Sequence, residues 1–196
     1  MHELTQLANK YGTDKGTEHF KYAHAYTEFY GPFLTPYKKT IKNMLEIGIF
    51  ECASMKMWRD FFPNTIVTGL ENTVLKENLY KDEDRLVVLD GRNAYSERTL
   101  SYFVKNSIKF DFILDDGPHD MPSWSFTLKH YTKLLTENGI LMIEDIGFIG
   151  ECHDLIDSFD GDKTRLTVID RTKTSVNVAG INYGPNRKPD YILLYM

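Results

Sequence analysis

The stretch of sequence that decides the fold reads Phe110-Asp111-Phe112-Ile113-Leu114-Asp115-Asp116-Gly117-Pro118-His119, and a second one reads Gly139-Ile140-Leu141-Met142-Ile143-Glu144-Asp145. In both, an apolar run typical of a buried strand in a parallel sheet ends in carboxylates. Ligands of open α/β sheets bind in the crevice beyond the carboxyl ends of the strands. The sequence therefore predicts an anionic pocket at one sheet edge, which calls for a hard metal ion, a positively charged cofactor, or both.

Short apolar runs alternate with helical patterns around these two stretches, which predicts a parallel sheet with helices on both faces. The expected strands are 43–48, 66–71, 86–90, 110–116, 140–145, 166–170 and 191–196. The expected helices are 53–62, 96–106, 122–136 and 151–159. A Gly/Asn/Pro-rich segment, 179–189, separates the last two strands and indicates a closing hairpin. Residues 1–40 are expected to form a helical cap, and 41–196 the main domain.

Bulk properties narrow the class of protein. The chain has 196 residues, 42% of them hydrophobic, and a net charge of −5, which argues against a nucleic-acid partner. No apolar run approaches the length of a membrane helix, and the first residues lack a signal pattern. Cys52 and Cys152 have neither disulfide nor metal-site spacing. We expect a cytoplasmic protein with reduced thiols and no membrane partner.

The ends of the first three strands fit a nucleoside lying across the sheet edge. Gly48 follows the first strand, where a glycine lets a ligand approach the backbone, although a full dinucleotide fingerprint is lacking. Glu71 ends the second strand, where a carboxylate commonly binds the ribose hydroxyls. Asp90 and its polar neighbours end the third strand and are candidates for the adenine side. An ordinary strand-to-helix turn and solvated strand-end acids are the structural alternatives.

Asp116, Glu144 and Asp145 suit an oxygen-loving dication such as Mg²⁺, with Mn²⁺ as an alternative. Adjacent side chains of a regular strand point to opposite faces, so Glu144 and Asp145 can both bind a metal only if the strand has ended before them. The structural alternative is that these acids cap the following helices.

His119 follows Asp116 after a Gly-Pro turn. A neutral imidazole there can take the proton of a substrate hydroxyl, whose pKa a bound metal would lower. A lone loop histidine can also be purely structural, but the neighbouring acidic cluster favours the catalytic interpretation.

With these residues in place, the chain resembles the class I S-adenosylmethionine-dependent methyltransferases. Within that class it is most similar to the metal-dependent sugar O-methyltransferases of macrolide biosynthesis, of the macrocin and mycinamicin type, and to the related cephalosporin hydroxylase-like group. The motifs that carry the resemblance are Lys10-Tyr11-Gly12-Thr13-Asp14-Lys15-Gly16, His24-Ala25-Tyr26-Thr27-Glu28-Phe29-Tyr30, Leu45-Glu46-Ile47-Gly48, Ser54-Met55-Lys56-Met57-Trp58-Arg59-Asp60, Gly69-Leu70-Glu71, Asp115-Asp116-Gly117-Pro118-His119 and Ile143-Glu144-Asp145.

The resemblance implies a Rossmann-like fold with the strand order 3-2-1-4-5-7-6 and a final antiparallel strand. It implies Mg²⁺ on Asp116, Glu144 and Asp145, with His119 as general base. It places S-adenosylmethionine against a set of six residues: Glu46, Gly48, Ser54, Glu71, Asp90 and Asp115. Family members usually have a glycine where Cys52 stands.

The resemblance also implies that an N-terminal element folds over the active site and brings His24, Tyr26 and Tyr30 near the acceptor. The expected reaction is Mg²⁺-assisted methyl transfer to a hydroxyl of a sugar or glycosylated small molecule. A catechol-type O-methyltransferase and a metal-dependent hydroxylase-like enzyme are the alternatives. The aromatic N-terminal segment offers apolar surface for a homodimer.

Overall fold

The structure is a computed structural model that describes residues 1–18, 23–172, 176–178, 181–183 and 191–196. Its helices and helical turns are α1 (Glu3–Tyr11), α2 (Thr27–Leu34), η1 (Thr35–Tyr37), α3 (Ala53–Phe61), η2 (Glu77–Leu79), α4 (Glu97–Lys105), α5 (Met121–Phe126), η3 (Thr127–Tyr131), η4 (Thr132–Leu134), α6 (Ile149–Ser158) and η5 (Lys163–Arg165). Its strands are β1 (Asn43–Ile47), β2 (Ile66–Leu70), β3 (Leu86–Leu89), β4 (Phe110–Asp115), β5 (Leu135–Ile146), β6 (Leu166–Asp170), β7 (Val176–Val178), β8 (Ile181–Tyr183) and β9 (Tyr191–Tyr195).

A seven-stranded sheet in the order β3-β2-β1-β4-β5-β9-β6 forms the middle layer. The first five strands pair in parallel, and β9 lies antiparallel between β5 and β6. This is the predicted order 3-2-1-4-5-7-6 with its final antiparallel strand, and both predictions are confirmed. β7 and β8 pair with each other in a separate two-stranded sheet.

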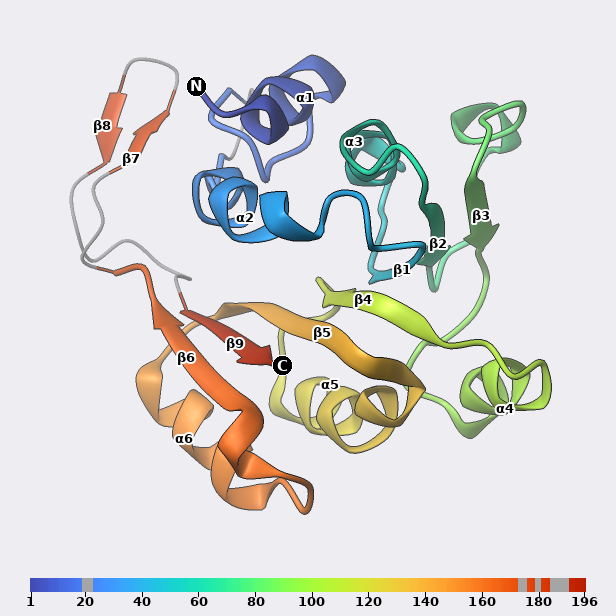
Figure 1. Ribbon diagram of the computed structural model, residues 1–196, viewed down its shortest axis with the longest axis vertical. Helices are drawn as coiled ribbons and strands as arrows, with labels where there is room; N and C mark the ends of the chain where they lie inside the picture. Colours follow the sequence, from blue (N-terminus) through green and yellow to red (C-terminus); the bar gives the residue numbers. More distant parts are fainter. Residues whose placement is uncertain (19–22, 173–175, 179–180, 184–190) are drawn as a thin grey trace.

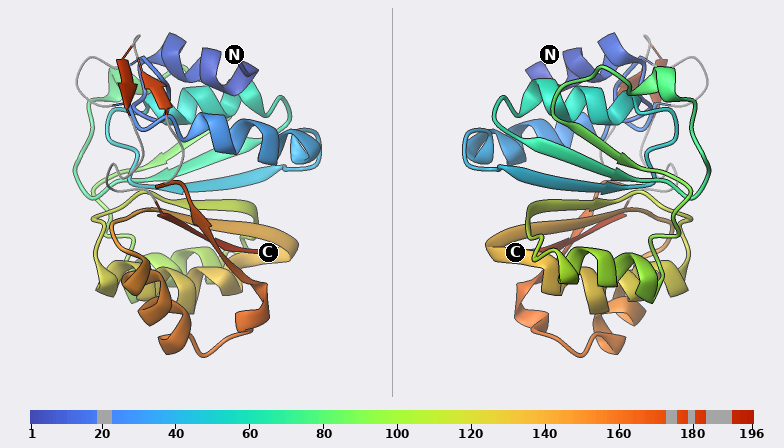
Figure 2. Two further views of the ribbon diagram at one scale, coloured as in Figure 1. Left: turned by 90° about the vertical axis from the view of Figure 1, so that its left-hand side faces the viewer. Right: turned by 90° about the vertical axis from the view of Figure 1, so that its right-hand side faces the viewer.

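Helices cover both faces of the sheet, as the strand spacing predicts. Helices α1, α2 and α3 lie on one face and α4, α5 and α6 on the other (Figures 1 and 2). Successive residues of β1 divide between the two resulting cores, with Met44 on the side of α1–α3 and Leu45 on the side of α4–α6. The first core includes Leu4 and Tyr30, so the N-terminal helices share apolar packing with the sheet.

The predicted bounds are most in error at one helix and at the strand that follows it. The predicted helix 122–136 ends at Leu134, after α5 has passed into a π-helical turn and a 3₁₀ turn. The next strand begins at Leu135, which pairs with Phe110, and continues to Ile146, so it extends beyond the predicted 140–145 at both ends. The extended backbone of Leu135 ends the helix, and no Gly or Pro marks that point.

The predicted loop 179–189 lies largely outside the described residues, which within it include only β8. Among the described residues, no helix combines the length and the apolar character needed to cross a membrane.

Candidate active site

A cavity of about 600 Å³ lies beyond the carboxyl ends of the parallel strands, where ligands of such sheets bind. The segments after β1, β2, β3 and β4 all contribute to it. Its lining includes Asp14, Gly48, Phe50, Glu71, Asn93, Tyr95 and Asp116.

Gly48 lines this cavity in the left-handed region, with φ of 81°. A Cβ atom there would lie 2.0 Å from the carbonyl oxygen of Asp116. The amide of Asp116 in turn donates to Ile47 O at 2.9 Å, which holds the ends of β1 and β4 together. Glycine is therefore required here by the approach of the protein's own backbone, in addition to any ligand. Cys52 also adopts a left-handed conformation, with φ of 64°.

Glu71 also lines the cavity, and its carboxylate is already oriented by its neighbours. Oε2 accepts from the amide of Phe50 at 3.1 Å, and Oε1 accepts from the amide of Thr73 at 3.0 Å. The fixed carboxylate faces the cavity at the position expected for a ribose partner.

Glu46 and Ser54, two residues predicted to contact the cofactor, bond to each other instead of lining the cavity. Glu46 is buried on the α3 side of β1, accepting from Ser54 Oγ at 2.9 Å and from Trp58 Nε1 at 3.1 Å. Burial raises the pKa of Glu46 to about 7, although the charge of Lys15 opposes the shift. The observed contacts tie helix α3 to the sheet.

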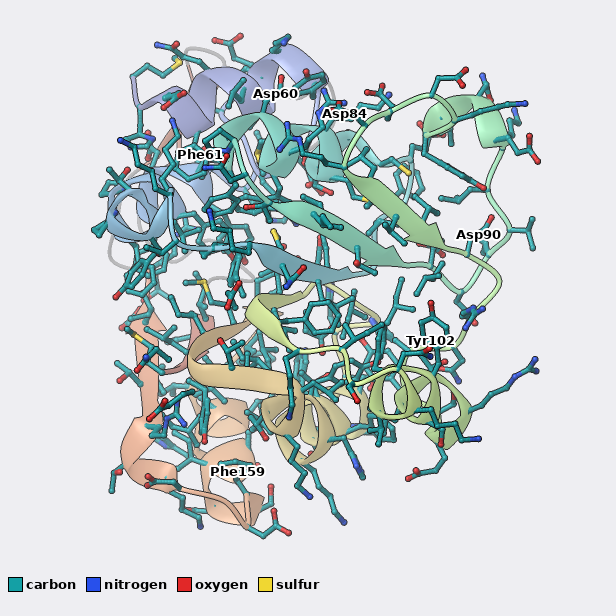
Figure 3. The ribbon with its side chains drawn as sticks, turned by 45° about the vertical axis from the view of Figure 1, so that its right-hand side comes forward. Asp60, Phe61, Asp84, Asp90, Tyr102 and Phe159 are labelled. Carbon is teal, nitrogen blue, oxygen red and sulfur yellow. The ribbon has the colours of Figure 1, made fainter. Side chains whose placement is uncertain are left out.

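Asp90 lies just beyond the end of β3 (Figure 3). Its Oδ2 accepts from the amide of Leu75 at 2.7 Å, which fixes the segment after β2. Asp90 does not line the cavity, whereas its neighbours Arg92 and Asn93 do.

Asp115, the last residue of β4, and Asp116, just after it, have different partners. Asp115 is buried on the side of α4 and α5, where it accepts from Tyr95 Oη at 2.7 Å, from Thr127 Oγ1 and from the amide of Gly117 at 3.1 Å. Burial raises its pKa to about 6 against the effect of these bonds. Its oxygens are thus satisfied within the protein, while Asp116 lines the cavity.

Glu144 and Asp145 both turn toward the N-terminal segment, although β5 continues past them to Ile146. The pairing of β5 with β9 shifts register between Ile143 and Ile146, and Asp145 has φ of 61°. The two side chains therefore reach the same edge although the strand continues past them, and whether both bind a metal stays a prediction. A β-bulge re-aims one side chain within the strand and brings two adjacent carboxylates to the same edge.

Lys15 occupies the centre of this acidic edge, and the sequence analysis assigned no role to it. Its side chain is only 2% exposed, and its Nζ contacts Asp116 Oδ2 and Glu144 Oε1. The other oxygen of Glu144, Oε2, accepts from Tyr30 Oη. The signal in the sequence was the need of the acidic pocket for a cation, which the chain partly supplies itself.

His119 joins the cluster from the turn after β4, in a left-handed conformation with φ of 57°. Its Nε2 lies 3.1 Å from Asp116 Oδ1 and 3.5 Å from Asp145 Oδ2. Asp116, His119 and Asp145 each present a ligand atom within 4.8 Å of the others, a group able to hold a metal ion. Left-handed non-glycine residues are uncommon and cluster at functional sites.

The segment between α1 and α2 places two further predicted residues on Asp145. Tyr26 Oη donates to Asp145 Oδ1 at 2.5 Å, and His24 Nδ1 lies 3.7 Å from the same oxygen. The rings of His24 and Tyr26 stack, with centroids 5.6 Å apart. Arg171, just after β6, lies 4.4 Å over the Tyr26 ring and donates to His24 O at 3.0 Å.

The electrostatics of the cluster follow from burial and proximity. Burial disfavours ionised Asp116, but the charge of Lys15 and the bond from His119 outweigh it, so the pKa of Asp116 is lowered. Burial raises the pKa of Glu144 well above its ordinary value against the opposing charge of Lys15. Burial also disfavours the imidazolium of His119, but Asp116 and Asp145 outweigh it and raise the pKa of His119.

The sheet order and the site at its carboxyl edge define the class I methyltransferase fold. The predicted resemblance to the macrocin- and mycinamicin-type sugar O-methyltransferases is confirmed by known proteins. A curated relative is 8-demethyl-8-(2-methoxy-α-L-rhamnosyl)-tetracenomycin-C 3′-O-methyltransferase of Streptomyces olivaceus, which is 26% identical over 151 residues, covering 74% of this chain and 37% of the relative. No family model matches the chain.

Solved structures support the same resemblance. MycE methyltransferase from the mycinamycin biosynthetic pathway, in complex with Mg and SAH, is 25% identical with a TM-score of 0.63, over 73% of this chain and 37% of that protein. The structure of MycE in complex with Mg, SAH and mycinamycin VI is 26% identical with a TM-score of 0.61, over 73% of this chain and 39% of that protein. A putative O-methyltransferase from Klebsiella pneumoniae shares the fold over 98% of this chain and 89% of its own, with a TM-score of 0.60 and 14% identity. The chain thus spans little more than a third of the length of the tetracenomycin and mycinamycin relatives.

Proposed function

We propose that this protein is an S-adenosylmethionine-dependent, Mg²⁺-assisted O-methyltransferase that acts on a hydroxyl of a sugar or of a glycosylated small molecule. The observation that carries the proposal is the convergence of Asp116, His119 and Asp145 beside the 600 Å³ cavity at the carboxyl edge of the sheet. The similarity to enzymes whose structures contain Mg and SAH supports it.

The donor set fits a dication. Carboxylate oxygens are the ligands that Mg²⁺ prefers, and an imidazole nitrogen also accommodates Mn²⁺. Asp116 and Asp145 would hold the ion, joined by Glu144 once Lys15 or Tyr30 yields one of its oxygens. The bound ion would supply positive charge that lowers the pKa of an acceptor hydroxyl.

The chain's own residues would bind the cofactor, orient the metal ligand and remove the proton of the acceptor. Gly48 and Glu71 would hold S-adenosylmethionine, with the carboxylate of Glu71 taking the ribose hydroxyls. Tyr26 and His24 would orient Asp145 and border the acceptor. His119 would remove the hydroxyl proton as the methyl group passes from sulfur to oxygen, which gives S-adenosylhomocysteine and a methyl ether. A general base must be neutral, and the positive charge of a neighbouring metal ion would favour the neutral imidazole of His119 by disfavouring its protonated form.

A second candidate is a hydroxylase-like enzyme with a redox-active metal, because His119 offers a ligand atom within 4.8 Å of those of Asp116 and Asp145. A nitrogen ligand suits iron better than magnesium. Dioxygen consumption that requires Fe²⁺, without methyl transfer, would favour this candidate. Methyl transfer to a catechol but to no sugar would instead favour the catechol-type alternative. Cytoplasmic location and a homodimer stay predictions.

The test is calorimetric titration of S-adenosylmethionine and S-adenosylhomocysteine into metal-stripped protein, repeated with Mg²⁺ present. We expect micromolar binding of both compounds, followed by methyl transfer in a screen of sugar and glycoside acceptors with added metal. Absence of binding under both conditions would overturn the methyltransferase proposal.

A further inference from the structure

Lys15 is a buried cation that contacts two of the three acids proposed to hold the metal. Its Nζ contacts Asp116 and Glu144, and its side chain is almost fully enclosed. A buried ammonium is costly unless it is paired, and its three donors match this carboxylate-rich environment. The lysine is therefore an integral part of the acidic cluster.

The backbone around Lys15 is fixed to the segment that carries the tyrosines. Lys15 O accepts from the amide of Thr27 at 3.0 Å, and Gly16 O accepts from the amide of Ala25 at 2.9 Å. The segment from Asp14 to Gly16 and the start of α2 thus form one unit. This unit delivers Lys15, Tyr26 and Tyr30, which together contact all three carboxylates.

The charges of the cluster suggest why the lysine is there. Asp116, Glu144 and Asp145 carry three negative charges when ionised, which one lysine and one dication together would neutralise. Like charges enclosed at one sheet edge repel strongly in a medium of low dielectric constant. In protein without metal, Lys15 supplies positive charge to this cluster.

We propose that Lys15 is a tethered counter-ion of the metal site, which holds the N-terminal segment on the acidic edge and weakens the binding of a divalent cation there. This inference rests on the proposed metal site and assigns Lys15 as a positioning residue. A dication that binds Asp116 and Glu144 must approach a fixed ammonium and compete with it for the same oxygens. Removal of the ammonium leaves both acids available to the ion.

The experiment measures Mn²⁺ affinity by the electron paramagnetic resonance signal of the free ion, in wild type and in Lys15→Met. We expect Lys15→Met to bind Mn²⁺ roughly tenfold more tightly or better, because a nearby positive charge is gone. Its metal-free form should melt more than about 5 °C below wild type, since two buried carboxylates lose their partner. Saturating Mn²⁺ should recover most of that loss. Amide exchange over residues 24–30 should also be faster in the metal-free variant.

Two variants serve as controls. Lys15→Arg keeps the charge and should retain an affinity within about threefold of wild type. Lys10→Met removes an exposed lysine of α1, 60% exposed and paired with Asp60, and controls for the change in net charge. If Lys15→Met does not fold, Lys15→Gln replaces it, because its neutral side chain still donates hydrogen bonds. It should also bind Mn²⁺ more tightly than wild type.

Unchanged or weaker Mn²⁺ binding in the neutral variants would overturn the proposal. Failure of both to fold even with Mn²⁺ would also overturn it, because the ion then cannot replace the lysine. Absence of Mn²⁺ binding in wild type and variants alike would overturn this inference together with the proposed metal site. Tighter binding in Lys15→Met without any methyl transfer by wild type would support the role of Lys15 while overturning the proposed activity.

Discussion

The imidazole Nε2 of His119 lies 3.1 Å from Oδ1 of Asp116, a residue three positions earlier in the same turn. His119 adopts a left-handed backbone in this turn, with φ of 57°. A non-glycine residue is held there at a cost of about 1–3 kcal/mol, which the surrounding structure offsets. The histidine side chain remains 38% exposed, so it stays accessible from outside the cluster.

The first prediction concerns this histidine as general base. His119→Ala should lower kcat for methyl transfer by about 10²–10⁴-fold, the usual cost of losing a base. Its affinity for S-adenosylhomocysteine, measured by calorimetry, should stay within about threefold of wild type, because His119 is not among the residues lining the cavity. His153→Ala, a change on the exposed face of α6, is the matched control. Activity close to wild type in His119→Ala would rule out the proposed role.

The second prediction concerns Tyr26, which supports Asp145 without itself being a proposed ligand. Tyr26→Phe removes the hydrogen bond to Asp145 Oδ1 and should weaken dication binding by about 10-fold or more, as loss of a partner behind a metal ligand does. Calorimetry with Mn²⁺ measures the effect. Tyr37 is a half-buried tyrosine of η1 away from the site, so Tyr37→Phe should leave the affinity for Mn²⁺ unchanged. Equal affinities in wild type and Tyr26→Phe would show that Asp145 needs no such support.

The sequence predicted the sheet and its acidic edge well because both depend on short-range patterns. Apolar runs mark buried strands, and parallel strands bring their carboxyl ends to one edge wherever they occur in the chain. Asp116 and Asp145 could therefore be placed at the same edge from their positions at the ends of two such strands. The end of the predicted helix 122–136 was misplaced because nothing in the local sequence marks the change to an extended backbone after Leu134.

Side-chain partners were harder to predict because they depend on packing between distant segments. Glu46 was predicted at the cofactor, but it points to helix α3, where Ser54 and Trp58 donate hydrogen bonds to its carboxylate. Lys15 reaches Glu144 across most of the chain, and no spacing in the sequence encodes that pair. The bulge at Asp145 is likewise a tertiary feature, seen in the pairing of β5 with the distant strand β9.

The third prediction concerns Gly48. Gly48→Ala should lower the free energy of unfolding by more than about 1 kcal/mol, because its Cβ would lie 2.0 Å from Asp116 O in a backbone that disfavours side chains. The resulting shift of Asp116 should also weaken binding of S-adenosylhomocysteine. Gly12→Ala is the matched control, since it has φ of 71° but no atom within 4 Å of the added carbon. Urea unfolding and calorimetry measure both effects, and equal losses in the two variants would refute the proposed clash.

The last prediction is a pH dependence that originates at Glu46. Burial raises the pKa of this carboxyl from 4.5 to about 7, so between these values the folded protein binds a proton that the unfolded chain does not. Stability must then fall as the pH rises through this range, by on the order of 2–3 kcal/mol for one such group. Glu46→Gln keeps the shape of the side chain and an acceptor for Trp58 Nε1 but removes the titration. The difference in free energy of unfolding between Glu46→Gln and wild type should therefore increase from pH 4.5 to pH 7.5. Urea unfolding across this range measures it, with the exposed Glu97→Gln at the start of α4 as control. A difference that stays constant or decreases with pH would contradict a buried, protonated Glu46.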